Sequence, residues 1–474
     1  MLPPSFSRIR RRWLPASTTL EHNTRLLYIE VFWAAVLSGV TSFDSAFAIR
    51  LGASNALIGL LSSAPPLIIA ALAIPAARML ERREDRRPYL FWSLFLMRAG
   101  YLLVAVLPIL APQHAAVWLV ALLIALNIPN AVFTAGWSPM LADILPERRR
   151  AFVFSRRSIF SAGMVALVTF IAGLWLNATA FPSNYQTLYA LGAAASFMSC
   201  LTLERLIIPP PAVDSPAPKP VGRRFQLPAI SWGAIKAERQ ANRSFWNLTV
   251  TAFVFNFGIG MSSPLFVLYW VRELNADDGW IGLNNGIKSL AVVVGYFLAE
   301  QLIRRKGFKW VFMRLSPLSF LYPFLSALLP DLTFILVLGV MIGLINPGID
   351  LSRINLLLKL APPRRRPTYM SFYTTVMNLG AVVAPLLSVA LAGVVGLRAG
   401  LFIAALVRLS GGLLALVFKV EEPAEPVQAL PDTVTIPAAV VVAPDDGPPS
   451  GDAGRGFTRG RSAGGEREDV DPVV

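Results

Sequence analysis

Long apolar runs recur along the whole chain, and they constrain its fold more than any other feature. Each is near the ~20 residues that a helix needs to cross ~30 Å of hydrocarbon. The runs cover residues 26–48, 55–79, 88–110, 115–142, 155–176, 186–207, 246–269, 280–303, 309–329, 332–351, 369–393 and 397–418. Because every backbone polar group in lipid must be satisfied within its own segment, and the alternating strands of a barrel are absent, helices are expected. The sequence predicts an all-α polytopic membrane protein with about 12 transmembrane helices.

Composition agrees with this fold class and gives its orientation. The chain is 55% hydrophobic and only 15% charged, whereas soluble domains contain about 25% charged residues. The formal net charge of +15 could suggest nucleic acid, but the basic residues form short clusters in alternate connections, which is typical of cytoplasmic loops. We therefore expect no nucleic-acid partner, both termini in the cytoplasm and a multi-pass protein of the inner (plasma) membrane.

The chain is poorly supplied for catalysis. It has a single cysteine, Cys200, and two histidines, His22 and His114. No HExxH, P-loop or GxGxxG context accompanies them, and one thiol cannot build a disulfide or a thiolate metal site. We expect no enzymatic activity, no cofactor and no metal.

Changes in composition divide the chain into five segments. Two six-helix halves, 26–207 and 246–420, are separated by a proline-rich cytoplasmic linker, 208–245. A cytoplasmic N-terminal tail covers 1–25, and an acidic tail rich in proline and glycine, expected to be disordered, covers 421–474.

The two halves resemble each other. Residues 53–60 (ASNALIGL) match 276–283 (ADDGWIGL) at an offset of 276 − 53 = 223. Residues 146–150 (PERRR) match 362–366 (PPRRR) at an offset of 362 − 146 = 216. Matches at nearly one offset and in the same topological places predict two six-helix pseudo-repeats, an architecture of transporters in which the site lies between the repeats.

The layout and three short motifs resemble the major facilitator superfamily over about residues 25–420. The motifs are the glycine- and arginine-bearing segment 295–309, the turn 143–148 and the Gly/Pro pattern of 380–385. The resemblance implies a secondary active transporter that moves a small organic solute by alternating access. It also implies a central cavity lined by the first, fourth, seventh and tenth spans.

Charged residues inside the apolar runs are the first candidates for the substrate or ion pathway, because they are costly in lipid. Lys288 could bind an anionic solute or serve as a counter-ion, with Asn284 one turn before it; alternatively it snorkels to the interface. Asp44 could bind and release a proton, or pair in water with Arg50.

Polar stripes on several spans are the second group of candidates. Either they line a cavity, or they form interhelical hydrogen bonds worth only ~0.6 kcal/mol each. The predicted pathway comprises Lys288, Asp44, Asn127, Asn130, Asn256, Asn284, Asn346 and Asn378.

A third group lies at the cytoplasmic helix ends. We interpret it as a gating network that stabilises one access state; the alternative is a set of solvated ion pairs of little energy. Its members are Arg82, Arg83, Asp143, Glu147, Arg305, Asp350 and Arg353. For Arg98 and Arg408 we favour structural pairing, and for Glu30 a pair with Arg25 at the inner membrane interface.

Three functions remain open from the sequence. The preferred one is secondary active transport of a small organic solute, with proton coupling through Asp44 as an expectation. The alternatives are an exporter of lipid-like or hydrophobic drug-like compounds, and a non-transporting membrane scaffold or sensor that uses the linker and tail. The expected partners are a small-molecule substrate of unknown class, the lipid bilayer and protons, with the chain acting as a monomer.

Overall fold

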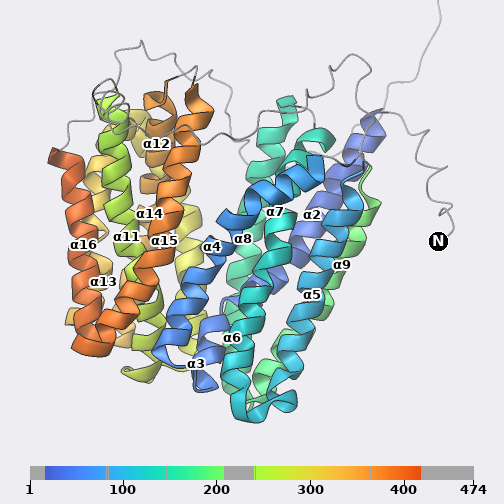
Figure 1. Ribbon diagram of the computed structural model, residues 1–474, viewed down its shortest axis with the longest axis horizontal. Helices are drawn as coiled ribbons and strands as arrows, with labels where there is room; N and C mark the ends of the chain where they lie inside the picture. Colours follow the sequence, from blue (N-terminus) through green and yellow to red (C-terminus); the bar gives the residue numbers. More distant parts are fainter. Residues whose placement is uncertain are drawn as a thin grey trace, which may run out of the picture. The chain divides into compact units, whose positions relative to one another are not determined.

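The computed structural model describes residues 16–81, 83, 85–145, 147–207, 240, 242–362 and 365–417. Within these ranges the regular structure is helical (Figure 1). The tail 421–474, nearly all of the linker and the first fifteen residues lie outside the described residues. The predicted all-α membrane fold is confirmed.

The first half contains nine helical elements, of which η1 is a single 3-10 turn. They are α2 (Ala16–Thr41), α3 (Asp44–Arg50), α4 (Asn55–Glu81), α5 (Arg87–Leu110), η1 (Pro112–His114), α6 (Ala115–Ala125), α7 (Asn127–Ile144), α8 (Glu147–Ala178) and α9 (Ser183–Arg205). The second half contains α11 (Arg243–Arg272), α12 (Asp278–Leu318), α13 (Leu321–Leu328), α14 (Leu332–Leu360), α15 (Arg366–Val395) and α16 (Leu397–Val417).

Each predicted span coincides with one or two of these helices. The first span is broken into α2 and α3, and the fourth into α6 and α7. Ten helical stretches of the described residues are long and apolar enough to cross a membrane. The two missing from the predicted twelve are α9, which does not qualify, and a division within 278–328, counted as one stretch. Gly307 interrupts the helix there with φ 82, a left-handed conformation that glycine adopts without a steric penalty.

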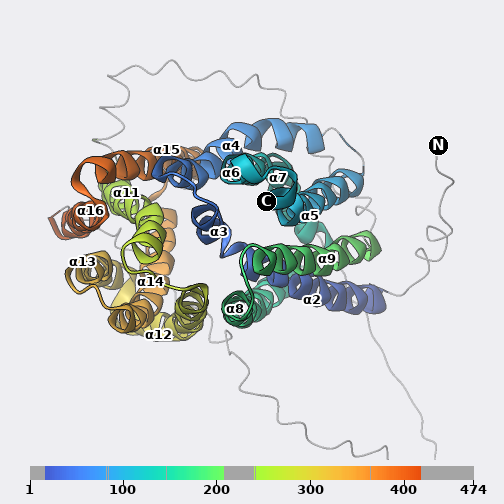
Figure 2. The ribbon, with the colours of Figure 1, turned by 90° about the horizontal axis from the view of Figure 1, so that it is seen from below.

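The halves meet mainly along two pairs of helices, α4 with α15 and α8 with α12, with smaller contacts of α11 with α3 and α4 (Figure 2). We call the end of the bundle that carries α3 and the starts of α4 and α12 the α3 end. The opposite end, where α9 finishes and α11 begins, is called the linker end (Figure 1).

Stacked aromatic rings hold α3 against α9 in the first half. The Phe47 ring stacks on Tyr185 with centroids 4.5 Å apart and on Tyr189 at 5.5 Å, and all three rings are fully buried. At the linker end, buried Asn23 pairs with the backbone of Ile207, donating to its carbonyl at 2.7 Å and accepting from its N–H at 2.9 Å. The first and last helices of the first half are thus joined at that end.

Candidate functional site

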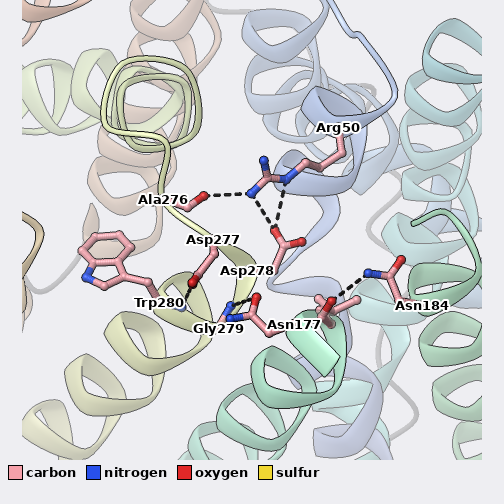
Figure 3. A network of polar contacts seen from close by, with 9 residues as sticks. Arg50, Asn177, Asn184, Ala276, Asp277, Asp278, Gly279 and Trp280 are labelled. Atoms are coloured by element: carbon pink, nitrogen blue, oxygen red, sulfur yellow. Dashed lines mark hydrogen bonds and ion pairs between the residues drawn. The ribbon is translucent and has the colours of Figure 1, made fainter. Parts of the chain in front are cut away.

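Arg50, the last residue of α3, reaches across to the second half (Figure 3). Its Nη2 donates to the carbonyl of Ala276 at 2.8 Å, and its Nε and Nη2 lie 3.4 Å from Oδ1 of Asp278. The Asp278 side chain is only 10% exposed. The ion pair therefore lies in a partly desolvated position, where it is worth more than a surface pair.

Arg272, the last residue of α11, makes the reverse connection. Its Nη2 donates to the carbonyl of Ala53, and its Nη1 donates to Oδ1 of Asn55, the first residue of α4. A side chain from each half therefore holds the start of a helix in the other half.

The two connections are related by the internal repeat. The offset of 223 that aligns Ala53 with Ala276 also aligns Asn55 with Asp278 (278 − 55 = 223). Each arginine therefore binds one backbone carbonyl and one side-chain oxygen at equivalent positions of the opposite half. We call Arg50, Arg272 and these four partners the arginine clamp. Its one chemical asymmetry is a carboxylate at Asp278 where the other half has an amide.

Helices α8 and α12 lie close together beside the clamp. A Cβ placed on Gly282 would lie 2.8 Å from Cα of Gly173, closer than real side chains tolerate. One turn nearer the α3 end, Oδ1 of Asn177 accepts a hydrogen bond from the backbone N–H of Gly279 at 3.0 Å (Figure 3). Small residues on both helices permit this backbone approach, as at many interfaces between membrane helices.

A cavity of about 460 Å³ lies beyond this contact, lined by residues of both halves. Its lining comprises Val31, Ala34, Ala35 and Ser38 of α2, Arg157, Ser158, Ser161, Ala162 and Val165 of α8, and Ser289 and Val292 of α12. At 1.5 Å per residue, Ser289 lies about 16 Å along α12 from Asp278, near the middle of a bilayer.

Among the described residues of that lining, Arg157 is the only charged one. Its Nη2 is 2.5 Å from Oε2 of Glu30, a residue only 3% exposed, and its guanidinium lies 5.2 Å from the ring centroid of Trp137. Glu30 is thus paired with Arg157 inside the bundle, and the expected pair with Arg25 at the inner interface is wrong. Arg157 follows a basic cluster in the sequence, but α8 begins at Glu147, so Arg157 lies nearly three turns inside the helix.

Comparison with known families identifies the fold. The sequence model of the Major Facilitator Superfamily matches residues 31–261 and again residues 248–442. The chain belongs to the Major Facilitator Superfamily. It is accordingly a protein of a transporter family and not an enzyme, and its double match agrees with two six-helix repeats.

Solved structures of other superfamily transporters share this fold at low sequence identity. A bacterial homologue of the human lysosomal transporter Spinster, in an inward-facing and unoccupied conformation, matches with a TM-score of 0.61 and 15% identity over 87% of this chain and 99% of that one. The xylose transporter XylE from E. coli, in an inward open conformation, gives 0.60 and 14% over 86% and 97%. A POT family transporter in complex with a thioalcohol-conjugated peptide gives 0.62 and 14% over 84% and 95%. Among curated proteins, none matches the sequence at a significant level.

Within this superfamily fold, the two charged residues of the predicted pathway have different surroundings. Lys288 is half-buried, and its Nζ donates to Oδ1 of Asn285 at 3.3 Å. Asp44 accepts a hydrogen bond from the Tyr189 hydroxyl at 2.5 Å. Arg50 binds the opposite half, so the alternative in which Asp44 pairs with Arg50 is wrong.

The predicted asparagines divide into three groups. Asn127, at the start of α7, donates to the carbonyl of Leu123 in α6 at 2.9 Å, and Asn256 donates to the carbonyl of Ala252 in its own helix at 2.7 Å. Asn284 is 1% exposed and faces α14, because a Cβ on Gly339 would lie 2.8 Å from its Oδ1. This position fits helix packing, and a role of Asn284 in the pathway stays a prediction. The remaining half-buried members are Asn130, Asn346 and Asn378.

The two mid-span arginines are held by polar neighbours. Arg408 donates to Oγ of Ser319 at 2.9 Å and lies 3.5 Å from Oδ1 of Asn346. Arg98 donates to Oγ of Ser199 at 3.4 Å. Both are at least nine-tenths buried, so they contribute to the interior of the bundle.

The predicted cytoplasmic gating network is only partly described. Arg82 lies outside the described residues, as do the side chains of Asp143 and Glu147. Arg83 lies over the Tyr89 ring at 5.1 Å, and Arg305 is exposed. Asp350 and Arg353 form an ion pair at 2.9 Å within α14. The described part of the network therefore contains one ion pair, and that pair joins neighbours on a single helix.

Proposed function

We propose that this superfamily member is a secondary active transporter of a small organic solute that works by alternating access. The arginine clamp is the observation that carries the proposal. Alternating access requires contacts between the halves that form in one state and break in the other. The clamp joins the halves at the α3 end through two side chains that each bind the opposite half, beside a cavity that both halves line.

The described state fits closure on the outer side of the membrane. The basic clusters of the sequence favour a cytoplasmic linker end, and the clamp then closes the outside. The inward-facing and inward open forms of two similar structures support the same assignment.

Cysteine labelling tests the proposal directly. In a Cys200→Ser background reconstituted into liposomes, we expect Ser289→Cys in the cavity to react with a membrane-impermeant maleimide from the linker side. Adding Arg50→Ala and Arg272→Ala should open the second route and give labelling from both sides. His114→Cys and Arg305→Cys serve as markers of the two sides, since both positions are exposed.

Labelling of Ser289→Cys from the same side only, with and without the clamp, would contradict alternating access. The scaffold or sensor alternative would then gain support. Intact transport after removal of 421–474 would argue against that alternative, since it requires the tail.

Proton coupling through Asp44 is the second part of the proposal. The carboxylate lies inside the first span and has a hydroxyl partner in Tyr189. We expect Asp44→Asn to lose uptake driven by a proton gradient by at least tenfold while solute exchange without a gradient persists. Tyr189→Phe is the matched control, because it removes the partner and keeps the carboxylate. Equal loss of both transport modes in Asp44→Asn would indicate a structural role instead.

One observation favours a lipid-like substrate. A groove of about 690 Å³ follows α2 near the linker end, with Tyr28, Phe32, Trp33 and Phe160 among its lining. Such an aromatic groove suits an amphipathic compound entering from the bilayer. Stabilisation of the protein by lysolipids but by no water-soluble solute would favour this second function.

A further inference from the structure

The bundle interior holds more cationic than anionic side chains. Away from the helix ends, the described residues place four cations inside the bundle: Arg98, Arg157, Lys288 and Arg408. The side chains that accept hydrogen bonds from Arg98, Lys288 and Arg408 are neutral: each acceptor is a serine hydroxyl or an asparagine amide oxygen. Among these four, and within the described residues, Arg157 alone forms an ion pair, with the carboxylate of Glu30. Unbalanced charge in the membrane is costly, and it marks sites where a charged solute can restore the balance.

The cavity between α2, α8 and α12 is where this excess can act on a solute. Its described lining contains Arg157 and four serines and no acidic residue. Three of these serines, Ser158, Ser161 and Ser289, have no hydrogen-bond partner among the described residues and can donate to a solute. The lining thus has hydrogen-bond donors and lacks the carboxylates that a cationic solute would need.

Arg157 retains donors beyond its ion pair. Glu30 accepts from Nη2, while Nε is buried and has no acceptor within the described part of the chain. A guanidinium has five N–H donors in a fork that matches carboxylate and phosphate oxygens. Because Glu30 already balances its charge, Arg157 adds little net electrostatic attraction for a solute. Its role is to supply hydrogen-bond donors that orient the solute.

The uncompensated charge comes from Lys288. It immediately precedes Ser289 and is one helical turn before Val292, and both of these residues line the cavity. Lys288 is not itself among the described lining residues. On α12 it lies between Asn284, which meets α14, and Val292, which lines the cavity, so it borders the cavity. Its hydrogen-bond partner is the neutral Asn285. An ammonium with only a neutral amide beside it attracts an anion in this low-dielectric setting.

We propose that the cavity binds a small organic oxyanion, a carboxylate or a phosphate ester, with Arg157 and the serines as donors and Lys288 as the balancing charge. This inference rests on the proposed transport function and names its substrate class. A neutral sugar would use the serines but would not need Lys288. A cation would face Arg157 and Lys288 with no free carboxylate in the cavity lining.

Thermal unfolding of the full-length protein in detergent tests the proposal. The probes are succinate, citrate and glucose 6-phosphate, with xylose and tetraphenylphosphonium as neutral and cationic comparisons. We expect at least one of the anions, and neither comparison solute, to raise the Tm in a saturable manner. Comparing the Tm shift given by succinate and citrate with that given by glucose 6-phosphate shows whether a carboxylate or a phosphate is the recognised group.

The variants assign the effect to the site. Lys288→Met should weaken binding of the stabilising anion ~10- to 100-fold, the loss expected for a charged hydrogen-bonding partner. Lys288→Arg should restore most of it, and Lys309→Met, a lysine lost near the far end of α12, should leave it unchanged. Ser289→Ala, which keeps every charge, should weaken binding by a smaller factor and covers the case in which Lys288→Met fails to fold.

The opposite results would overturn the proposal. They are stabilisation by xylose or by the cation with none by the anions, no shift with any solute, or an unchanged shift in both Lys288→Met and Ser289→Ala. Side-dependent labelling of Ser289→Cys does not depend on which solute binds. Its persistence beside a failed anion test would refute the substrate class alone, and its absence would refute transport by alternating access.

Discussion

Arg50→Ala combined with Arg272→Ala is expected to shift the protein out of the described state by roughly a hundredfold in the equilibrium between access states. Together the two side chains donate to Ala276, Asp278, Ala53 and Asn55 across the halves. Hydrogen bonds that involve a charged group contribute ~1.5–3 kcal/mol when buried. Arg50 is 31% exposed and Arg272 is also exposed, so solvent screening reduces the share of both, and about 3 kcal/mol remains for the two together.

Spin-label distances at the α3 end measure this shift. Cysteines at His114 and Pro330, exposed positions of the two halves, report the separation in a Cys200→Ser background. We expect a single short distance in the parent and a dominant longer one in the double variant. Each single variant should give a mixture, because the other arginine still holds.

Arg398→Ala is the matched control for the clamp. Arg398 also donates to backbone carbonyls at the α3 end, those of Ala327 at 2.6 Å and Leu328 at 3.0 Å, but all three residues belong to the second half. The distance should stay short in this variant. Asn55→Asp is expected to act in the opposite direction to the arginine variants. It gives Arg272 a carboxylate partner like Asp278 and should stabilise the closed state. An unchanged distance in the double variant would remove the clamp from the mechanism.

Gly282→Ala is expected to disrupt the same closure by a different route. The new Cβ would lie 2.8 Å from Cα of Gly173 and 2.8 Å from the carbonyl oxygen of Thr169. Both neighbours are backbone atoms and cannot move without shifting α8 itself. Overpacking of this kind costs ~1–3 kcal/mol, and separation of α8 from α12 relieves it. We expect the α3-end distance to lengthen and labelling of a cavity cysteine from that side to rise.

Gly163→Ala is the control, because it should leave the stability of the protein unchanged or raise it. Gly163 also lies on α8, but a Cβ there has no atom within 4 Å. Alanine in place of an unhindered helical glycine favours the helix by up to ~1 kcal/mol. The spin-label distance should not change, and the Tm should stay the same or rise. Equal behaviour of the two variants would show that the close contact of α8 with α12 does not control the access state.

The fold could be predicted from the sequence because lipid imposes local requirements. A segment that crosses hydrocarbon must be about 20 apolar residues long and helical, and both properties can be counted residue by residue. The repeat of 53–60 at 276–283 was visible in the same way, and it predicted two related halves. The breaks inside spans, such as that between α2 and α3, were not predicted, because an apolar run does not show where a helix bends.

The site could be predicted only in part, because a side chain's partner belongs to another helix. Lys288 and Asp44 were found as charges in apolar runs, but Glu30 was assigned to Arg25, its neighbour in sequence, while the structure pairs it with Arg157. Arg157 was missed because it follows a basic loop cluster and its depth depends on where α8 begins.

The sequence by itself determined that this protein is embedded in lipid, that it is helical, that it has two related halves, and that Lys288 and Asp44 are charges within apolar runs. The helices follow from composition within windows of about 20 residues, and the repeat follows from matches between distant segments at one offset. The tertiary structure alone decided that Arg50 and Arg272 bind equivalent positions of opposite halves, and that Arg157 and Ser289 line one cavity. Such pairings join residues more than a hundred positions apart, and they are set by which helices lie side by side.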